Sequence, residues 1–239
     1  MTSTNDAQVA EVRALVAAES PQTGDNPGVT GWMQRLCRAA SRSLPATGVG
    51  VSLMSETGNH VAYAASDPSC ERFEELQFTM GEGPCVDAYA SRQPLLTSDL
   101  VEVVGRWPGY ATAIQDHGVR AVFAFPLQIG AARLGAMDIY RAGVGGLSAS
   151  ELTMAFAFAE VAMGALLDAQ DGSVTSFQQE VAGNRFELYQ AQGMVKVQLG
   201  VSLHEAMVRI RAYAYANARP IGDVADDIVA RRVVLARDS

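Results

Sequence analysis

The stretch RAVFAFPLQIGAARLGAMDIYR, residues 120–141, decides the fold class of this chain. It predicts two strands, 120–129 and 133–141, joined across Gly130, Ala131 and Ala132. Apolar side chains alternate along the first strand: Phe123, Phe125, Leu127 and Ile129. That alternation is typical of a strand with one face in a core. The strands of a hairpin run antiparallel, so we expect an antiparallel sheet.

A second hairpin is expected upstream, where residues 48–53 and 60–65 flank a turn at Thr57, Gly58 and Asn59. Between the two hairpins the sequence predicts a short helix at 84–90, a short strand at 95–98 and a loop containing Trp107, Pro108 and Gly109. Strands in hairpins with helices at their flanks indicate an α+β fold.

Two amphipathic helices are expected before the first strand, at 6–19 and 30–44. Their apolar faces consist of Val9, Val12, Leu15 and Val16 in the first helix and of Met33, Leu36, Cys37, Ala40 and Leu44 in the second. Neither helix carries a chemical motif, so we expect them to pack against the folded body or against a second copy of the chain. Residues 1–29 are assigned to an N-terminal helix and linker.

A long helix is predicted after Ser148, which forms a capping box with Glu151. Apolar side chains then recur every three to four residues: Leu152, Phe156, Ala159, Met163 and Leu166. The spacing continues through a connector at 169–184 with Phe177, Val181 and Asn184. Two packings stay open, because the helix can form a coiled coil between two chains or lie wholly on its own domain.

Residues 185–239 predict an all-α module of three short helices. Gly200 ends the first helix, Ser202 caps the second, and Pro220 marks the turn into the third. Each helix contributes one apolar stripe to a common core: Leu188, Ala191, Val195 and Leu199; Leu203, Met207, Ile210 and Ala214; and Ile221, Val224, Ala225, Ile228 and Val229.

Basic charge is concentrated in this module, although the whole chain has a formal net charge of -8. Residues 1–174 hold 10 Lys and Arg against 19 Asp and Glu, a net of -9, whereas residues 175–239 hold 8 against 7, a net of +1. A module this nearly neutral offers only a local basic patch, which argues against tight, non-specific coating of DNA.

The basic patch supplies a candidate RNA-binding site made of Gly193, Lys196, Arg209, Arg211, Tyr215 and Arg219. Lys196 is the only lysine, and it follows Gly193, where the missing side chain lets another backbone approach. Basic side chains beside aromatic rings suit unstacked nucleotides, and Arg209 with Tyr213 and Arg211 with Tyr215 are each four residues apart. The alternatives are a solvated helix face for Lys196 and a place in the core for Tyr213.

A helix-turn-helix on duplex DNA is the competing interpretation of the three helices. Its third helix would enter the major groove, but Asp223, Asp226 and Asp227 are expected on the exposed side of that helix. Carboxylates facing phosphates oppose binding, so we expect RNA rather than DNA.

Several motifs occur in order along the module: Ala191-Gln192-Gly193-Met194, Gln198-Leu199-Gly200, Glu205-Ala206, Arg211 and Asp223-Val224-Ala225. Over residues 186–232 they resemble the ANTAR domain, a three-helix RNA-binding module of bacterial antiterminators. The resemblance implies that the module binds paired RNA hairpins in a nascent transcript and prevents a terminator from forming. It adds Gln192 to the candidate RNA-binding site, at a position where the family often has Lys.

Three upstream motifs read Met80-Gly81-Glu82-Gly83-Pro84-Cys85-Val86-Asp87, Phe125-Pro126-Leu127 and Leu134-Gly135-Ala136-Met137. They resemble the GAF domains that precede ANTAR in actinobacterial regulators, over roughly residues 32–168. The resemblance implies a sensor domain, assigned to 30–168, with an antiparallel sheet flanked by helices. GAF ligands range from cyclic nucleotides to haem and tetrapyrroles to none, so the ligand and any cofactor stay unknown.

Cys37, Cys70 and Cys85 are odd in number and lack C-x-x-C spacing, so we expect reduced thiols. Cys85 begins a predicted helix, and a helix N-terminus lowers the pKa of a thiol, so a redox sensor or enzyme centred on Cys85 is an alternative function. No motif places His60, His117 or His204 near Cys85, which favours a buried apolar role. His60, His117 and Asp138 are scattered singly, without metal-ligand spacing, so we predict no metal site. We also assign no catalytic residue and expect no enzyme activity.

The sequence has no run of eighteen apolar residues and no signal peptide, so a cytoplasmic protein without membrane contact is expected. We expect a homodimeric regulator in which a GAF-type sensor, a helical connector and an RNA-binding module control transcription antitermination. The signal would enter through a small-molecule ligand or a protein partner of the sensor. No motif identifies the target transcripts or the activity of the resting state.

Overall fold

The computed structural model describes residues 4–54, 60–172, 186–217 and 219–236 of the 239-residue chain. The chain forms two compact units, one of residues 1–78 and 82–173 and one of residues 79–81 and 174–239. Each unit has buried apolar side chains of its own. The turn predicted at Thr57 to Asn59 and the connector from residue 173 to 184, with Phe177, Val181 and Asn184, lie outside the described residues.

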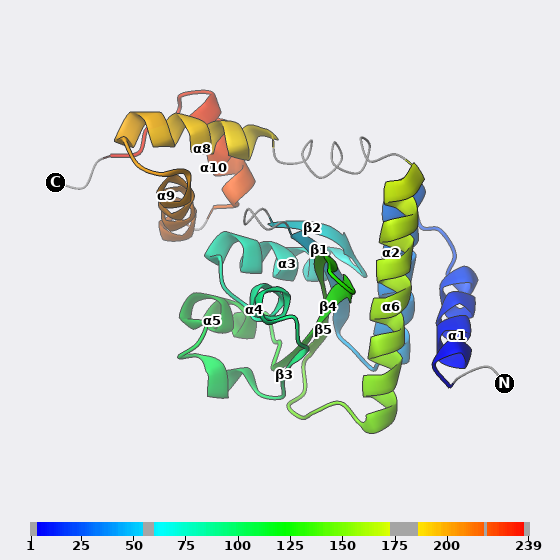
Figure 1. Ribbon diagram of the computed structural model, residues 1–239. Helices are drawn as coiled ribbons and strands as arrows, with labels where there is room; N and C mark the ends of the chain where they lie inside the picture. The colour runs from blue at the N-terminus through cyan, green and yellow to red at the C-terminus, as the bar shows by residue number, and fades with distance from the viewer. Residues whose placement is uncertain (1–3, 55–59, 173–185, 218, 237–239) are drawn as a thin grey trace. The chain divides into compact units, whose positions relative to one another are not determined.

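A five-stranded sheet forms the centre of the N-terminal unit (Figure 1). Its strands are β1 (Gly48–Met54), β2 (His60–Ala65), β3 (Leu95–Thr97), β4 (Ala121–Ile129) and β5 (Ala132–Arg141). They lie in the order β2-β1-β5-β4-β3, and each neighbouring pair is antiparallel. The predicted α+β fold with an antiparallel sheet is therefore confirmed.

Helices cover both faces of the sheet (Figure 1). On one side lie α2 (Gly28–Ser43) and α6 (Ala149–Gly172), with α1 (Thr4–Ala18) packed against both. On the other side lie α3 (Pro68–Met80), α4 (Pro84–Ser91) and α5 (Pro108–Asp116), and the 3-10 helix η1 (Leu100–Val103) precedes α5. Because both faces are covered, β4 is buried on both sides from Ala121 to Phe125, and the alternation predicted there is hidden.

Three sequence-based predictions in this unit need correction. Helix α3 was not expected, because Glu74 and Gln77 occupy its buried face and interrupt the apolar pattern. The loop predicted around Trp107 instead contains the start of α5. Pro108 occupies its first turn, where proline's lack of an N–H costs no hydrogen bond. Ile129, predicted to face the core, is 50% exposed because β4 ends there.

Helix α6 begins with the predicted capping box: the Ser148 N–H donates to Glu151 Oε2, and the Glu151 N–H donates to Ser148 Oγ. Ala159, Met163 and Leu166 of its apolar stripe are buried against the unit, whereas Phe156 is 49% exposed. Residues 149–169 are long and apolar enough to cross a membrane by length and composition alone, but this helix packs on β4 and β5.

The C-terminal unit contains α8 (Phe186–Leu199), α9 (Leu203–Ala216) and α10 (Ile221–Val229). Its core holds the following side chains: Leu188, Ala191, Val195, Ala206, Ile210, Ala214, Ile221, Val224, Ala225 and Ile228. Gly200 follows α8 with φ +71°, and Ser202 Oγ accepts the Glu205 N–H at the start of α9, as predicted. Leu203, predicted to be in the core, is 49% exposed because it is the first residue of α9.

Candidate functional site

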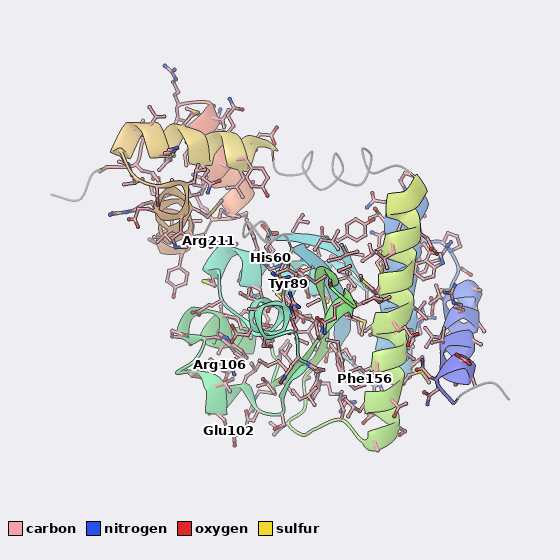
Figure 2. The ribbon with its side chains drawn as sticks, in the orientation of Figure 1. His60, Tyr89, Glu102, Arg106, Phe156 and Arg211 are labelled. Carbon is pink, nitrogen blue, oxygen red and sulfur yellow. The ribbon has the colours of Figure 1, made fainter. Side chains whose placement is uncertain are left out.

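A cluster of buried polar side chains lies between the sheet and the helices α3 and α4. Its members come from five elements and are nearly or fully inaccessible to solvent: Ser52 (β1), His60 (β2), Glu74 and Gln77 (α3), Cys85 (α4), and Asp138 and Tyr140 (β5). We call these seven residues the buried polar cluster. His60 is labelled in Figure 2. Buried polar groups are costly unless hydrogen-bonded, so a cluster of this size indicates a functional site.

Glu74 is held by hydrogen bonds to both of its carboxyl oxygens. The Tyr140 hydroxyl donates to Oε1 at 2.6 Å, and the Ser52 hydroxyl donates to Oε2 at 2.5 Å. Gly50 on β1 makes room for this carboxyl, because a Cβ at Gly50 would lie 2.3 Å from Glu74 Oε1. The position of Glu74 is thus fixed from two strands.

Gln77 connects the second carboxyl of the cluster to helix α4. Its amide nitrogen donates to Asp138 Oδ2, and its amide oxygen accepts the backbone N–H of Cys85 at 2.8 Å. Asp138 Oδ1 is buried and has no hydrogen-bond partner among the described residues. This oxygen is the polar atom of the cluster most in need of a ligand.

Neither carboxyl of the cluster forms an ion pair within the part of the chain that the structure describes. Burial raises the pKa of the Glu74 carboxyl to about 7. Burial and the neighbouring Glu74 charge raise the pKa of Asp138 well above its usual value. Burial therefore disfavours the charged form of both carboxyls, and a nearby cation would favour it.

Cys85 lies next to His60, contrary to the sequence-based expectation that no histidine is near it. The distance from Cys85 Sγ to His60 Nε2 is 3.7 Å, and the ligand atoms of His60, Glu74 and Cys85 all lie within 4.8 Å of one another. The expectation that histidines are scattered singly is therefore wrong for His60, because the fold brings the first residue of β2 beside the first turn of α4. Burial raises the pKa of the Cys85 thiol well above its usual value, so this sulfur is a protonated thiol rather than a catalytic thiolate.

Two acidic residues of the motif at 80–87 have structural roles at the edge of the cluster. Glu82 Oε1 accepts the N–H groups of Gly109 and Tyr110 at 2.7 and 2.9 Å, in the first turn of α5. Asp87 accepts from the Trp107 indole and from Arg106, which is labelled in Figure 2. The motif thus fastens α5 beside α4.

The candidate RNA-binding residues differ in how far their charge is already compensated. Lys196 is exposed on α8 and forms no ion pair within the described residues. Arg209 donates to Glu205 at 2.9 Å, and Arg219 donates to Asp227 at 2.6 Å. Tyr215 is 60% exposed, as a stacking residue must be, and Arg211 is partly buried. Lys196 is therefore the residue of this set whose charge is most available to bind a phosphate.

Gly193 lies at a groove, and Gln192 makes a contact within the module. A Cβ at Gly193 would meet nothing within 4 Å among the described residues, so no other described segment packs closely on this glycine. Gly193 instead lines a groove of about 630 Å³ together with Met194, Val197 and Arg231. Gln192 donates its amide to the carbonyl of Leu203 at 2.8 Å, which ties α8 to the start of α9.

The acidic face predicted for α10 is partly neutralised. Arg219 and Arg232 both donate to Asp227 at 2.6 Å, whereas Asp223 and Asp226 are exposed. The sequence argument against DNA therefore rests on two carboxylates rather than three.

Sequence reasoning missed the buried polar cluster, although two signals were available. Asp138 interrupts the run of uncharged residues from Leu134 to Tyr140, and Glu74 and Gln77 are three residues apart among Cys70, Phe73 and Phe78. Charged or amide side chains on a buried face are seldom tolerated without a partner, so both positions marked a site.

Comparison with known proteins identifies the N-terminal unit. A sequence model of the GAF domain matches residues 29–166, and no curated protein matches the chain. The GAF domain of a phosphoenolpyruvate-protein phosphotransferase from Acinetobacter is similar with a TM-score of 0.50 at 6% identity, over 72% of this chain and 98% of its own. The corresponding domain from Coxiella burnetii has a TM-score of 0.52 at 13% identity, over 71% and 96%.

At these identities the likeness to solved structures concerns the fold alone. The sequence match, however, spans more than half of the chain, and the antiparallel sheet with flanking helices agrees with it. The chain therefore belongs to the GAF domain family, and residues 29–166 form a signal-sensing domain of that family.

Proposed function

We propose that this protein is a signal-responsive regulator whose C-terminal unit binds RNA hairpins and promotes transcription antitermination. The GAF domain supplies the sensing part. The motifs from Ala191 to Ala225 resemble ANTAR, and the three helices that carry them enclose one small core. The protein acts in the cytoplasm as a homodimer and catalyses no reaction.

The exposed position of Lys196 is the observation that best supports the RNA-binding proposal. Its ammonium group is exposed and forms no ion pair among the described residues, so binding a phosphate breaks no interaction inside the protein. Arg231 lies at the groove that Gly193 lines, and it is likewise exposed. An exposed cation at a largely apolar groove suits a folded RNA backbone next to an accessible base.

Arg209 and Arg219 differ from Lys196 because each already forms an ion pair. Each is paired with a carboxylate, Glu205 or Asp227, and must give up or share that pair to hold a phosphate. Their contribution to RNA affinity is therefore smaller than that of Lys196. This ranking makes the proposal testable residue by residue.

The test measures binding of the full chain to a panel of RNA stem-loops over a range of salt concentrations. We expect affinity to fall with salt, and Lys196→Ala to lower the slope of log K against log salt by about 1. Arg231→Ala should lower this slope by a similar amount, and Arg209→Ala and Arg219→Ala should lower it by less. Arg72→Ala removes an exposed arginine of the N-terminal unit and serves as the matched control.

Duplex DNA of the same sequence forms the second arm of this experiment. Stronger binding to duplex DNA than to stem-loops would favour the helix-turn-helix alternative. A wild-type protein that ignores every stem-loop at low salt, or a Lys196→Ala variant with unchanged salt dependence, would contradict RNA binding at this surface. Readthrough of a terminator in a purified transcription reaction then tests antitermination itself.

A further inference from the structure

We propose that His60, Glu74 and Cys85 bind a divalent transition-metal ion, with zinc(II) as the first candidate. The three side chains come from β2, α3 and α4 and are 5%, 0% and 0% exposed. Imidazole, carboxylate and thiolate are the ligand types that zinc takes in proteins. The site goes beyond the proposed RNA-binding function and lies entirely within the GAF domain.

The geometry of the histidine and the cysteine already fits a metal. Zinc lies about 2.3 Å from sulfur and about 2.0 Å from imidazole nitrogen, so a tetrahedral ion places these atoms about 3.5 Å apart. The observed distance from Cys85 Sγ to His60 Nε2 is 3.7 Å. The Glu74 oxygen lies within 4.8 Å of both atoms, and a contraction of about 1 Å completes the set.

The charge of the cluster supports a cation. Glu74 and Asp138 are both fully buried, and neither is paired with Arg or Lys in the described part of the chain. The Tyr140 hydroxyl lies 2.6 Å from Glu74 Oε1 and 3.4 Å from Asp138 Oδ2, so the two carboxyls are neighbours. A divalent cation is balanced by the Glu74 carboxylate together with the Cys85 thiolate. Asp138 is the neighbouring carboxyl, and its Oδ1 has no hydrogen-bond partner among the described residues.

Neighbouring residues hold the proposed ligands in place. Ser52 and Tyr140 bind the Glu74 carboxyl, and Gln77 accepts the backbone N–H of Cys85. Such supporting contacts orient ligands at metal sites. On binding, the Cys85 S–H bond breaks, its proton leaves to solvent, and the sulfur donates its electron pair to the metal.

The experiment uses untagged, reduced full-length protein titrated with cobalt(II), which reports thiolate ligation by its near-ultraviolet charge-transfer band. We expect the wild type to develop this band and zinc(II) to abolish it. Cys85→Ser loses the band, and His60→Gln loses or strongly weakens it. Tyr140→Phe, which removes a support of Glu74, weakens cobalt binding by about 10-fold to 100-fold.

Cys37→Ser is the matched control, because Cys37 is equally buried but lies in α2 on the other side of the sheet. This variant keeps the band. The proposal is overturned if the wild type shows no band, if Cys85→Ser retains it, or if Cys37→Ser loses it as well.

X-ray absorption of the zinc-loaded wild type gives a readout that needs no variant. One sulfur in the first coordination shell supports the site, and a shell of oxygen and nitrogen alone refutes it. Every readout here is metal binding, so failure of the metal proposal does not affect the RNA-binding test. Failure of the RNA-binding proposal likewise does not affect the metal test.

Discussion

Cys85 shows how two opposing effects are decided at the scale of one residue. Its place in the first turn of α4 favours the thiolate by about 0.3–1 kcal/mol, which is less than one pKa unit. Full burial acts in the other direction by up to about 3–5 units. Burial is the larger effect, so the pKa of the Cys85 thiol is raised. Without a metal, this cysteine is therefore a poor nucleophile.

Asp25 and Arg38 supply a pH-dependent contribution to stability. Arg38 Nη1 and Nη2 each donate to one Asp25 oxygen at 2.8 Å, and this pairing lowers the pKa of Asp25 to about 2. Because the folded pKa is below the unfolded value, the stabilisation is complete above about pH 4 and is lost as the pH falls towards 2.

We predict that Asp25→Asn lowers the free energy of unfolding by about 2 kcal/mol near neutral pH. Urea unfolding measured across the acid range checks this, since the difference from wild type should shrink as the pH approaches 2. Glu19 also faces Arg38, at 3.9 Å, so Glu19→Gln serves as a comparison with a smaller effect. A loss that stays constant with pH would contradict the assigned pairing.

Gly50 is required by the buried polar cluster rather than by a turn. Its Cβ would lie 2.3 Å from a Glu74 oxygen that two hydrogen bonds hold in place. We predict that Gly50→Ala lowers the free energy of unfolding by about 1–3 kcal/mol. Gly146→Ala is the control, because open space surrounds that position and its effect should stay within about 0.5 kcal/mol. Equal stabilities of the two variants in chemical unfolding would refute the prediction.

At the scale of elements, the ends of helices were the most predictable features. Pro84 occupies the first turn of α4, Ser148 and Glu151 cap α6, and Ser202 caps α9. These signals work because capping involves side chains and N–H groups only two or three residues apart. Helix α3 was not predicted, because its buried face is partly polar and the spacing of apolar residues alone does not reveal it.

The cap of α9 gives a prediction at this scale. Ser202→Ala removes the acceptor of the Glu205 N–H and should cost the C-terminal unit about 1 kcal/mol. Ser202→Asp keeps an acceptor and should retain wild-type stability. Hydrogen exchange of the amides in α9 is the measurement, with faster exchange in Ser202→Ala only. Equal exchange in both variants would show that the cap contributes nothing.

At the scale of the whole molecule, the structure bears on the choice that the sequence left open for the long helix. Met163 and Leu166 of α6 are buried against the helix's own unit, which also contributes α1 and α2 as neighbours. Phe156 is half exposed, with its ring against Phe125 at a centroid distance of 5.3 Å. The helix therefore packs on its own domain through one face, and whether the rest of it meets a second chain stays a prediction.

The proposed homodimer is tested with the full chain in solution. We predict a molar mass twice the 25.3 kDa of one chain by light scattering.

We also propose that a signal changes the packing of the connectors and so the spacing of the two RNA-binding units. Crosslinking from Lys196 with and without zinc(II) measures that spacing. An unchanged crosslinking pattern would rule out zinc as a signal of this kind.

The sequence by itself determined the α+β class, the two hairpins, the helix caps and the three-helix tail, because each depends on residues close together in the chain. It also showed that Lys196 is the only lysine of the chain. Only the tertiary structure decided that His60 meets Cys85, that Glu74 and Asp138 share a buried space, and that Arg219 faces Asp227. These three pairs are 25, 64 and 8 positions apart in the sequence, and strand order and helix packing bring them together rather than any local pattern.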